Sequence, residues 1–265
     1  MKVSCIPLCF NKELREERTM SVGEWARLAA RIGLDGIELY RPYVEPWDEE
    51  HLLAARTDIE GAGVEISMLT SYCDFGILGQ EHFTEQVEFI KGEVDAAALV
   101  GTDIVRMTAG LLHEGVAIED ALPNVARGLK ACLDHAGDRG VMIALEDHPQ
   151  IGLHIRDFLS ILDLVDDERL KVNLDTWNPS YVGEDCVDLV GHVAHRVVHV
   201  HCADSRPGIE HKLPLGEGTV RFQPIFAELK RAGFDGWISM EIGGPVGAEA
   251  IADGMEFVKQ TWAHL

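Results

Sequence analysis

Short apolar runs alternate along the chain with segments in which apolar residues recur every three or four positions. Short runs bounded by turn residues are typical of buried strands, whereas the three-and-four spacing is typical of helices that pack through one face. The helical pattern is clearest over residues 22–32, 87–98, 225–229 and 255–262. Eight strands are predicted between such segments, over residues 3–8, 36–40, 64–70, 103–108, 141–146, 171–175, 197–201 and 237–242.

Glycine stands where several of the predicted helices end. Gly33, Gly101, Gly140 and Gly233 each follow a helical pattern, at the place where a left-handed residue commonly ends a helix. The sequences GLDGIE and GFDGWI, which begin at Gly33 and Gly233, are near-copies of this helix end, turn and strand start. Eight strand–helix alternations without a dividing linker predict an α/β fold, a (β/α)8 TIM barrel that forms a single domain over residues 1–265.

The last four predicted strands carry polar side chains on one face and apolar side chains on the other. Successive side chains of a strand point to opposite faces, so Glu146 shares a face with His148, and Ile143 shares the other face with Leu145. The apolar face must pack under the helices, which leaves the polar face to line the barrel interior. The inward face also holds Glu38, Arg106, Asn173, Asp175, His199, His201 and Glu241, whereas Asp147 and Cys202 take the outward face.

Four side chains able to bind a metal end four successive strands: Glu146, Asp175, His201 and Glu241. Taken singly, each is typical of a solvated strand end. Together on inward faces they cannot be buried without a partner, and a shared divalent cation provides one. The mostly oxygen ligand set suits Mn²⁺ first, with Mg²⁺, Co²⁺ or Zn²⁺ as alternatives.

Three other inward residues surround this predicted site. His148 lies two residues past Glu146, nearer the barrel mouth, and is either a solvated rim histidine or a general base or substrate contact. Arg106 either neutralises buried acid or binds a substrate oxygen. His199 lies one layer deeper than His201 and is predicted to be a hydrogen-bonded core residue.

The segment after the seventh strand, residues 204–218, is long and rich in glycine, proline and charge. At the carboxyl end of a barrel strand, such a segment is typical of a substrate loop, and the alternative is an ordinary solvated loop. The substrate-loop interpretation makes Arg206, His211 and Lys212 candidates for substrate binding.

The composition weighs against several classes of partner. The chain is 46% hydrophobic, which is enough for a full core, and its net charge of −22 repels nucleic acid and anionic membranes. No apolar stretch is long enough to span a bilayer. The six cysteines show no Cys-x-x-Cys spacing, and the first residues predict a strand and not a signal sequence. A cytoplasmic protein with reduced, mostly buried thiols is expected.

The chain resembles the xylose-isomerase-like TIM-barrel superfamily, the sugar-phosphate isomerase/epimerase group, over nearly its whole length. Segments 145–146, 174–176, 198–201, 216–219 and 233–241 carry the resemblance. It implies metal ligands at Glu146, Asp175, His201 and Glu241, the same four that the strand alternation indicates. It also implies a metal-dependent isomerase or epimerase that removes the proton next to a metal-bound carbonyl of a sugar or sugar derivative. The candidate catalytic residues are His148, from its position on the same face as Glu146 and nearer the mouth, together with Glu146 and Glu241.

Departures from family patterns narrow this expectation. The sequence DTWN from Asp175 replaces an Asp-x-x-His pattern, which weighs against a three-zinc site like that of endonuclease IV. Gly152 and Pro207 stand where ketohexose 3-epimerases have a Glu and an Arg, so an epimerase of that type is not expected. The Glu146-x-His148 arrangement looks more like the catalytic subunits of bacterial C-glycoside deglycosidases.

Three functions therefore stay open at the sequence level. The first is the isomerase or epimerase, and the second is a carbon–carbon lyase or dehydratase, such as a subunit that eliminates the aglycone from a 3-oxo C-glycoside. The third is a non-catalytic sugar-binding barrel with a structural metal. In each case a small sugar or glycoside is the expected partner, and binding to nucleic acid or to a membrane is not expected. A homo-oligomer is expected, or a hetero-oligomer with a small partner subunit for a deglycosidase.

Overall fold

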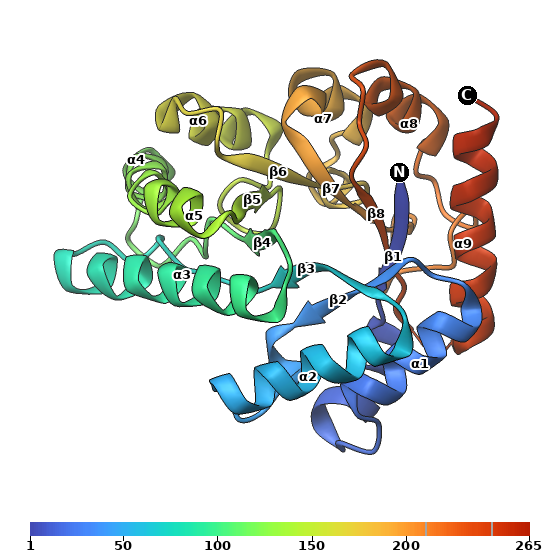
Figure 1. Cartoon of the computed structure of the whole chain (residues 1–265). Helices are drawn as coiled ribbons and strands as arrows, with labels where there is room; N and C mark the ends of the chain where they lie inside the picture. The colour runs from blue at the N-terminus through green and yellow to red at the C-terminus, as the bar shows by residue number, and fades with distance from the viewer. Residues whose placement is uncertain (210, 245) are drawn as a thin grey trace.

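Eight parallel strands form a nearly closed barrel, with the helices arranged around its outside (Figure 1). The computed structural model describes residues 1–209, 211–244 and 246–265. The strands are β1 (Lys2–Ile6), β2 (Gly36–Tyr40), β3 (Glu65–Thr70), β4 (Ile104–Met107), β5 (Met142–Glu146), β6 (Lys171–Asp175), β7 (Val197–Cys202) and β8 (Trp237–Glu241). Each of the eight predicted strands is confirmed, with ends that agree within two residues.

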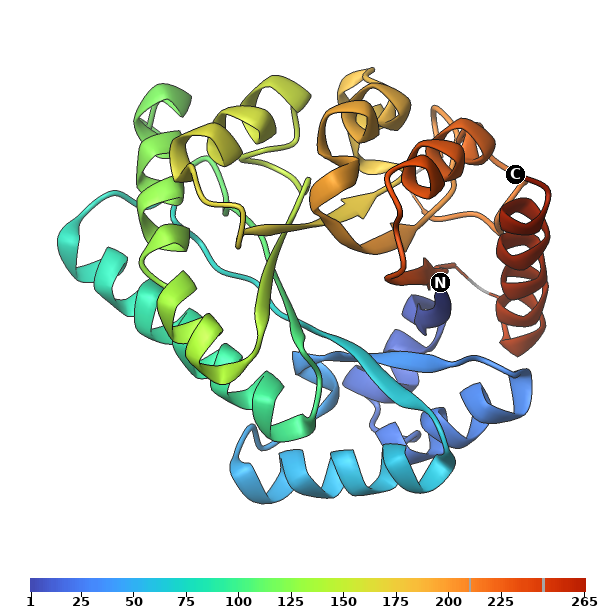
Figure 2. The same cartoon turned by 45° about the horizontal axis from the view of Figure 1, so that its top comes forward.

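Helices follow the strands in the order that a (β/α)8 barrel requires. They are α1 (Val22–Ile32), α2 (Glu49–Ala62), α3 (Gln80–Val100), α4 (Ile118–Lys130), α5 (Leu133–Arg139), α6 (Ile155–Val165), α7 (Cys186–Val193), α8 (Phe222–Arg231) and α9 (Ala248–Ala263). Short helical turns are η1 (Leu8–Phe10), η2 (Lys12–Glu16), η3 (Arg41–Tyr43), η4 (Asn178–Val182) and η5 (Ala194–Arg196). The second view shows the N-terminus inside this ring and α9 on its outside (Figure 2).

The predicted helix ends are confirmed at glycine. Gly33, Gly101 and Gly140 end α1, α3 and α5 in the left-handed conformation, with φ of 94°, 85° and 68°. At the other end of α1, Ser21 and Glu24 each bind the other's backbone N–H, which supplies partners for two otherwise unpaired donors.

The sheet runs from β2 at one edge to β1 at the other, in the order β1-β8-β7-β6-β5-β4-β3-β2. Asp35, just before β2, joins these two edges. Its backbone N–H donates to the Val3 carbonyl at 2.9 Å, and its Oδ2 accepts from the Val3 N–H at 2.9 Å. Asp35 therefore links the two edges through one backbone and one side-chain hydrogen bond.

Two separate groups of apolar side chains lie on the two sides of the strands. Outward residues such as Leu145 and Val200 are fully buried under the helices. Inside the barrel, a second cluster of buried residues closes the end where the strands begin: Met68, Ile104, Ala144 and Trp237. This apolar plug leaves the polar inward residues at the opposite end, where the strands finish. Burying such side chains contributes about 1.5–3 kcal/mol each.

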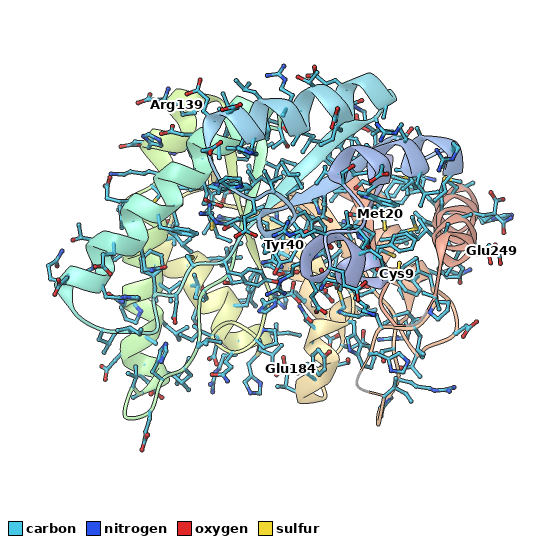
Figure 3. All side chains as sticks on the ribbon, turned by 90° about the horizontal axis from the view of Figure 1, so that it is seen from below. Cys9, Met20, Tyr40, Arg139, Glu184 and Glu249 are labelled. Atoms are coloured by element: carbon cyan, nitrogen blue, oxygen red, sulfur yellow. The ribbon has the colours of Figure 1, made fainter. Side chains whose placement is uncertain are left out.

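The cysteines agree with the sequence analysis. All six cysteines are free thiols, and five of them are buried. Burial raises the pKa of Cys9 to about 11, so this half-buried residue near the middle of Figure 3 is a protonated thiol at neutral pH. Among the described residues, none of the helices combines the length and hydrophobicity of a bilayer span.

We predict that Asp35→Ala lowers the free energy of unfolding by about 1–3 kcal/mol, because the buried Val3 N–H loses its acceptor. The near-copy residue Asp235 provides a matched control. It binds the N-terminal ammonium at 2.8 Å with its own side chain 90% exposed, so Asp235→Ala should change little. Urea unfolding followed by circular dichroism measures both variants. Equal destabilisation by the two substitutions would contradict the role assigned to Asp35.

Candidate metal centre and active site

Three of the four predicted ligands converge at the ends of their strands. Glu146, Asp175 and His201 are buried, and each offers a ligand atom within 4.8 Å of the others. The strand register explains the convergence, since Asp175 lies directly beside His201 on the neighbouring strand. The fourth predicted ligand, Glu241, is not part of this group of three. Lys212 links it to the group, because its Nζ is 2.9 Å from Glu241 Oε2 and 3.5 Å from Asp175 Oδ2.

His201 lies between two carboxylates. Its Nδ1 is 2.6 Å from Glu146 Oε1, and its Nε2 is 3.1 Å from Glu38 Oε2. Burial alone would lower the pKa of His201, but Glu38 and Glu146 outweigh burial and raise it well above its usual value. Thr70 donates to the same Glu38 oxygen at 2.6 Å. Glu38 therefore fixes the orientation of the imidazole and keeps Nδ1 directed toward Glu146, a common arrangement behind metal-bound histidines.

Arg106 forms a buried ion pair with Glu146. Its Nη2 is 2.9 Å from Glu146 Oε2, and both side chains are at most 3% exposed. Burial raises the pKa of Glu146, but Arg106 and His201 more than offset this effect and hold it well below its usual range. Asn173 donates to the other oxygen, Oε1, at 3.2 Å. The structure therefore gives Arg106 the charge-neutralising role, and its contact with substrate stays a prediction.

Asp175 presents one oxygen to the site. Its Oδ1 accepts from the N–H groups of Trp177 and Asn178 at 2.7 and 2.8 Å, which leaves Oδ2 toward Lys212. Burial raises the pKa of Asp175 to about 7, although Lys212 opposes this shift. The outward Asp147 accepts from the Asp175 N–H at 2.8 Å, as the strand alternation predicts for a residue paired with backbone.

The donor set fits a divalent cation. Within the described part of the chain, Glu146 Oε2 and Glu241 Oε2 are buried and make no well-directed hydrogen bond, although Arg106 and Lys212 approach them closely. Buried carboxylate oxygens without a directed donor, beside an imidazole, are ligands that such a cation takes. Glu146, Asp175, His201 and Glu241 could hold it. His201 also belongs to a second group of the same kind, with Glu38 and His199.

His199 is a neutral core residue. Its Nδ1 is 2.8 Å from Asn173 Oδ1, an oxygen that can only accept, so Nδ1 carries the proton. Burial lowers the pKa of His199 to about 3, despite the nearby Glu38. The predicted hydrogen-bonded core position is therefore confirmed.

His148 has one ring nitrogen free to accept a proton. Its Nδ1 is 2.7 Å from the Pro149 carbonyl oxygen, which can only accept, so Nδ1 donates and Nε2 keeps its lone pair. The ring packs edge-on against Tyr72, with centroids 5.5 Å apart. Burial lowers the pKa of His148, although Glu146 opposes this effect. The imidazole is therefore neutral at neutral pH, as a general base must be.

The predicted substrate loop is held together by Asp204. The carboxylate of Asp204 accepts from the N–H groups of Gly216, Gly218 and Val220 at 2.8–3.2 Å. Its carbonyl accepts from the Leu213 N–H at 2.8 Å, which fixes the backbone next to Lys212. The same loop leaves the side chains of Arg206 and His211 exposed, so their substrate contacts stay predictions, and Glu210 lies outside the described residues.

Sequence reasoning left three contributors out of the predicted site. Glu38 and Asn173 have the inward phase, which is a usable signal, but no pattern indicates which partner each one binds. Tyr72 lies just beyond β3, where the Arg106 guanidinium stacks on its ring at 4.3 Å. A lone tyrosine in a loop carries no comparable signal.

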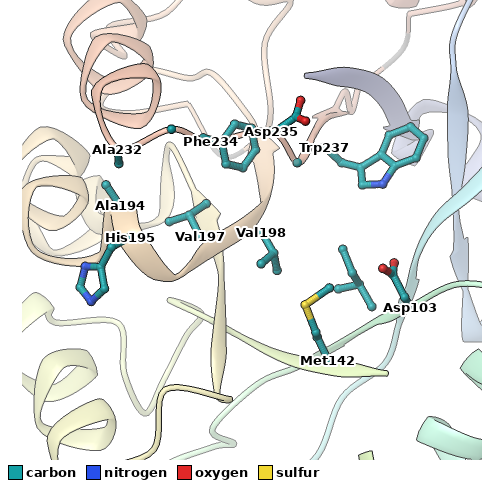
Figure 4. Close-up of a pocket in the computed structure, with 13 residues that line it drawn as sticks. Asp103, Met142, Ala194, His195, Val197, Val198, Ala232, Phe234, Asp235 and Trp237 are labelled. Carbon is teal, nitrogen blue, oxygen red and sulfur yellow. The ribbon is translucent and has the colours of Figure 1, made fainter. Parts of the chain in front are cut away.

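A separate cavity of about 320 Å³ lies at the opposite end of the barrel (Figure 4). It opens beside the starts of β5 and β8, between Met142, Val198 and Trp237. Trp237 belongs to the apolar plug, which separates this cavity from the carboxylates. Active sites of such barrels lie at the carboxyl ends of the strands, so the cavity is not the candidate site.

The comparison with known families agrees with this fold. The family described as "Xylose isomerase-like TIM barrel" matches residues 26–261, so the chain belongs to that family. A curated relative, L-ribulose-5-phosphate 3-epimerase UlaE from Salmonella paratyphi C (strain RKS4594), is 27% identical over 237 residues, with 83% of each chain covered. The sequence resemblance to sugar isomerases and epimerases is thereby confirmed.

Two further proteins are similar to this chain, one in sequence and one in structure. An inosose dehydratase from Clostridium botulinum (strain Alaska E43 / Type E3) is 30% identical over 135 residues, which cover 44% of this chain and 45% of the relative. A solved structure described as the IOLI protein with a binding zinc atom superposes with a TM-score of 0.81 at 18% identity. That superposition covers 100% of this chain and 99% of the other, and at this identity it shows the fold alone.

We predict that Lys212→Met destabilises the protein in EDTA by about 3 kcal/mol, because Asp175 and Glu241 lose their shared ammonium group. The measurement is thermal unfolding at pH 8, above the pKa of about 7 that Asp175 has in the wild-type protein, where Lys212 opposes the effect of burial. Lys2→Met is the matched control, since Lys2 pairs with Glu65 on the surface, where the two side chains are 51% and 61% exposed. A Lys212 variant as stable as this control would contradict the contact.

Proposed function

We propose that the protein is a divalent-metal-dependent enzyme that removes the proton next to the carbonyl of a sugar or sugar derivative. The observation that carries this proposal is the convergence of Glu146, Asp175 and His201, with incompletely bonded buried oxygens, at the carboxyl ends of the strands. Family membership and the epimerase relative support the sugar-type substrate.

Glu146, Asp175, His201 and Glu241 would hold the cation, with Mn²⁺ as the first choice and Mg²⁺, Co²⁺ or Zn²⁺ as alternatives. Bound there, it supplies Lewis acidity toward the oxygens of a carbonyl and its neighbouring hydroxyl. Glu38 holds His201 in place through Nε2, and Arg106 keeps Glu146 ionised.

His148 is the proposed general base. Its Nε2 would take the α-proton, while Nδ1 stays bound to the Pro149 carbonyl. Lys212 is 13% exposed on its side chain and lies over Asp175 and Glu241, where its ammonium would donate to a substrate oxygen. Glu146 and Glu241 are the alternative proton acceptors of the site.

The step after proton removal distinguishes the candidate activities. Returning the proton to the other face gives an epimer, and returning it to the adjacent carbon gives an isomer. Loss of a β-substituent instead gives a dehydratase or a lyase, and the inosose dehydratase relative favours elimination as the second candidate. A 3-oxo C-glycoside lyase falls within this second class. The oligomeric state, a partner subunit and a cytoplasmic location stay predictions.

Metal analysis tests the ligand assignment. Purified protein is expected to contain about one divalent metal per chain, and Asp175→Ala to lose most of it, because Oδ2 of Asp175 is one of few ligand atoms at the site. Inductively coupled plasma mass spectrometry measures the metal after gel filtration. Asp134→Ala is the control, since that side chain is 89% exposed and is not part of the ligand cluster. Unchanged metal in Asp175→Ala would refute the assignment.

Deuterium exchange tests the chemistry. The enzyme is expected to wash solvent deuterium into the α-carbon of a keto-sugar, and His148→Ala to slow this exchange roughly 10²–10⁴-fold with metal content intact. Proton NMR of a keto-sugar panel in D₂O follows the reaction. His154→Ala is the control, because His154 is 53% exposed and pairs with Glu184 on the surface.

Each result has a clear reading. Near-normal exchange in His148→Ala would exclude its role as the base, and loss of metal would make it a ligand. Metal-loaded wild-type protein that exchanges no proton of any keto-sugar would favour the non-catalytic sugar-binding barrel.

A further inference from the structure

A second cavity, of about 440 Å³, lies at the carboxyl end of the barrel beside His148. The residues that line it come from the segments that follow β3, β4 and β5 and from α3. They include Tyr72, Phe89, Leu111, His148 and Pro149. The volume falls within the range of about 300–1,000 Å³ that is usual for small-molecule sites.

Apart from His148, whose Nε2 is free, the carboxylate of Asp74 and the side-chain oxygen of Gln86 in the walls of this cavity already have partners. Asp74 Oδ1 accepts from the N–H groups of Gly76 and Leu111 at 2.9 and 3.1 Å, and Asp74 Oδ2 is 2.7 Å from His113 Nε2. Gln86 Oε1 accepts from the Asp74 N–H at 2.8 Å. A ligand that enters would therefore gain little from these groups and would bind chiefly by burying apolar surface.

The cavity adjoins the candidate active site through two side chains. Tyr72 carries the Arg106 guanidinium on its ring at 4.3 Å, and Arg106 pairs with Glu146 at 2.9 Å. His148 borders the cavity and follows Glu146 by two residues. A group that fills the cavity would therefore lie next to the proposed base.

The rim of the cavity exposes large apolar side chains. Tyr72 and Leu111, which both line the cavity, are 44% and 50% exposed. A bound flat ring would cover part of this surface and could pack edge-to-face on Tyr72 or Phe89.

We propose that this cavity is a subsite for an aromatic group attached to the sugar-like substrate, close to the carbon that loses its proton. The substrate class is then a carbonyl-bearing sugar or glycoside with an aryl substituent, for which plain aryl glycosides serve as unreactive analogues, an inference that rests on the proposed function. A second copy of the chain is the rival occupant. The position beside His148 and the volume of about 440 Å³ favour the small aromatic group.

Calorimetric titration with matched glycosides tests the subsite. Phenyl and methyl β-glycosides of glucose, galactose and xylose are compared on the full chain with added MnCl₂. For at least one sugar, the phenyl glycoside is expected to bind about tenfold more tightly, because only the ring buries apolar area in the cavity.

Two neighbouring leucines provide a matched pair of variants. Leu111 lines the cavity, whereas Leu112 is 41% exposed on the same loop and is not among the lining residues. Both are held through backbone N–H groups, to Asp74 Oδ1 and Gln150 Oε1, which the substitutions leave in place. Leu111→Ser should remove most of the phenyl preference, and Leu112→Ser should keep it.

Three results would overturn the subsite. The first is that no phenyl glycoside binds more tightly than its methyl counterpart. The second is an equal loss of the phenyl preference in both variants. The third is that no phenyl preference is found and light scattering gives both variants a lower molecular mass than the wild-type protein. The last result would identify the surface as an interface between copies of this chain. A phenyl preference without deuterium exchange would retain the subsite and refute the proposed chemistry, whereas exchange without a phenyl preference would do the reverse.

Discussion

Four carboxylates share the interior of one small barrel, and their mutual repulsion is the constraint on which the rest of the site depends. Glu38, Glu146, Asp175 and Glu241 face three groups that can be cationic, Arg106, His201 and Lys212. Buried charges of one sign are tolerated only with close partners, so each cation contacts at least one acid. Acids exceed cations by one, four against three, so above the pKa of about 7 at Asp175 the site has a net attraction for further positive charge.

The barrel geometry makes this concentration of acid possible. Strand alternation directs the apolar residues outward to the helices, where they form the main core. The plug around Trp237 occupies the interior at the end where the strands begin, below the carboxylates. Stability therefore comes from the outward face and the plug, and the upper interior is available for ionisable groups that a purely apolar core would not accept.

The strands, the barrel and the convergence of Glu146, Asp175 and His201 could be predicted from the sequence, because each follows from the two-residue period of a strand. The contacts that complete the site could not. Glu38 meets His201 across 163 residues of chain, and period alone does not say which strands face each other at one level. Lys212 reaches Asp175 only because a folded loop returns to the barrel mouth. Sequence patterns describe the direction of a side chain within an element, but not the path of an irregular segment.

That loop allows the side chains exposed at the barrel mouth to change while the position of Lys212 stays the same. Asp204 gathers three backbone N–H groups and so holds the ends of the loop without help from the exposed side chains between them. Substitutions at positions such as Arg206 or His211 can therefore alter what the barrel mouth meets in solution while Lys212 keeps its place. A descendant of this protein could acquire a new substrate through surface changes alone, since the lysine and the acids beneath it are positioned by backbone.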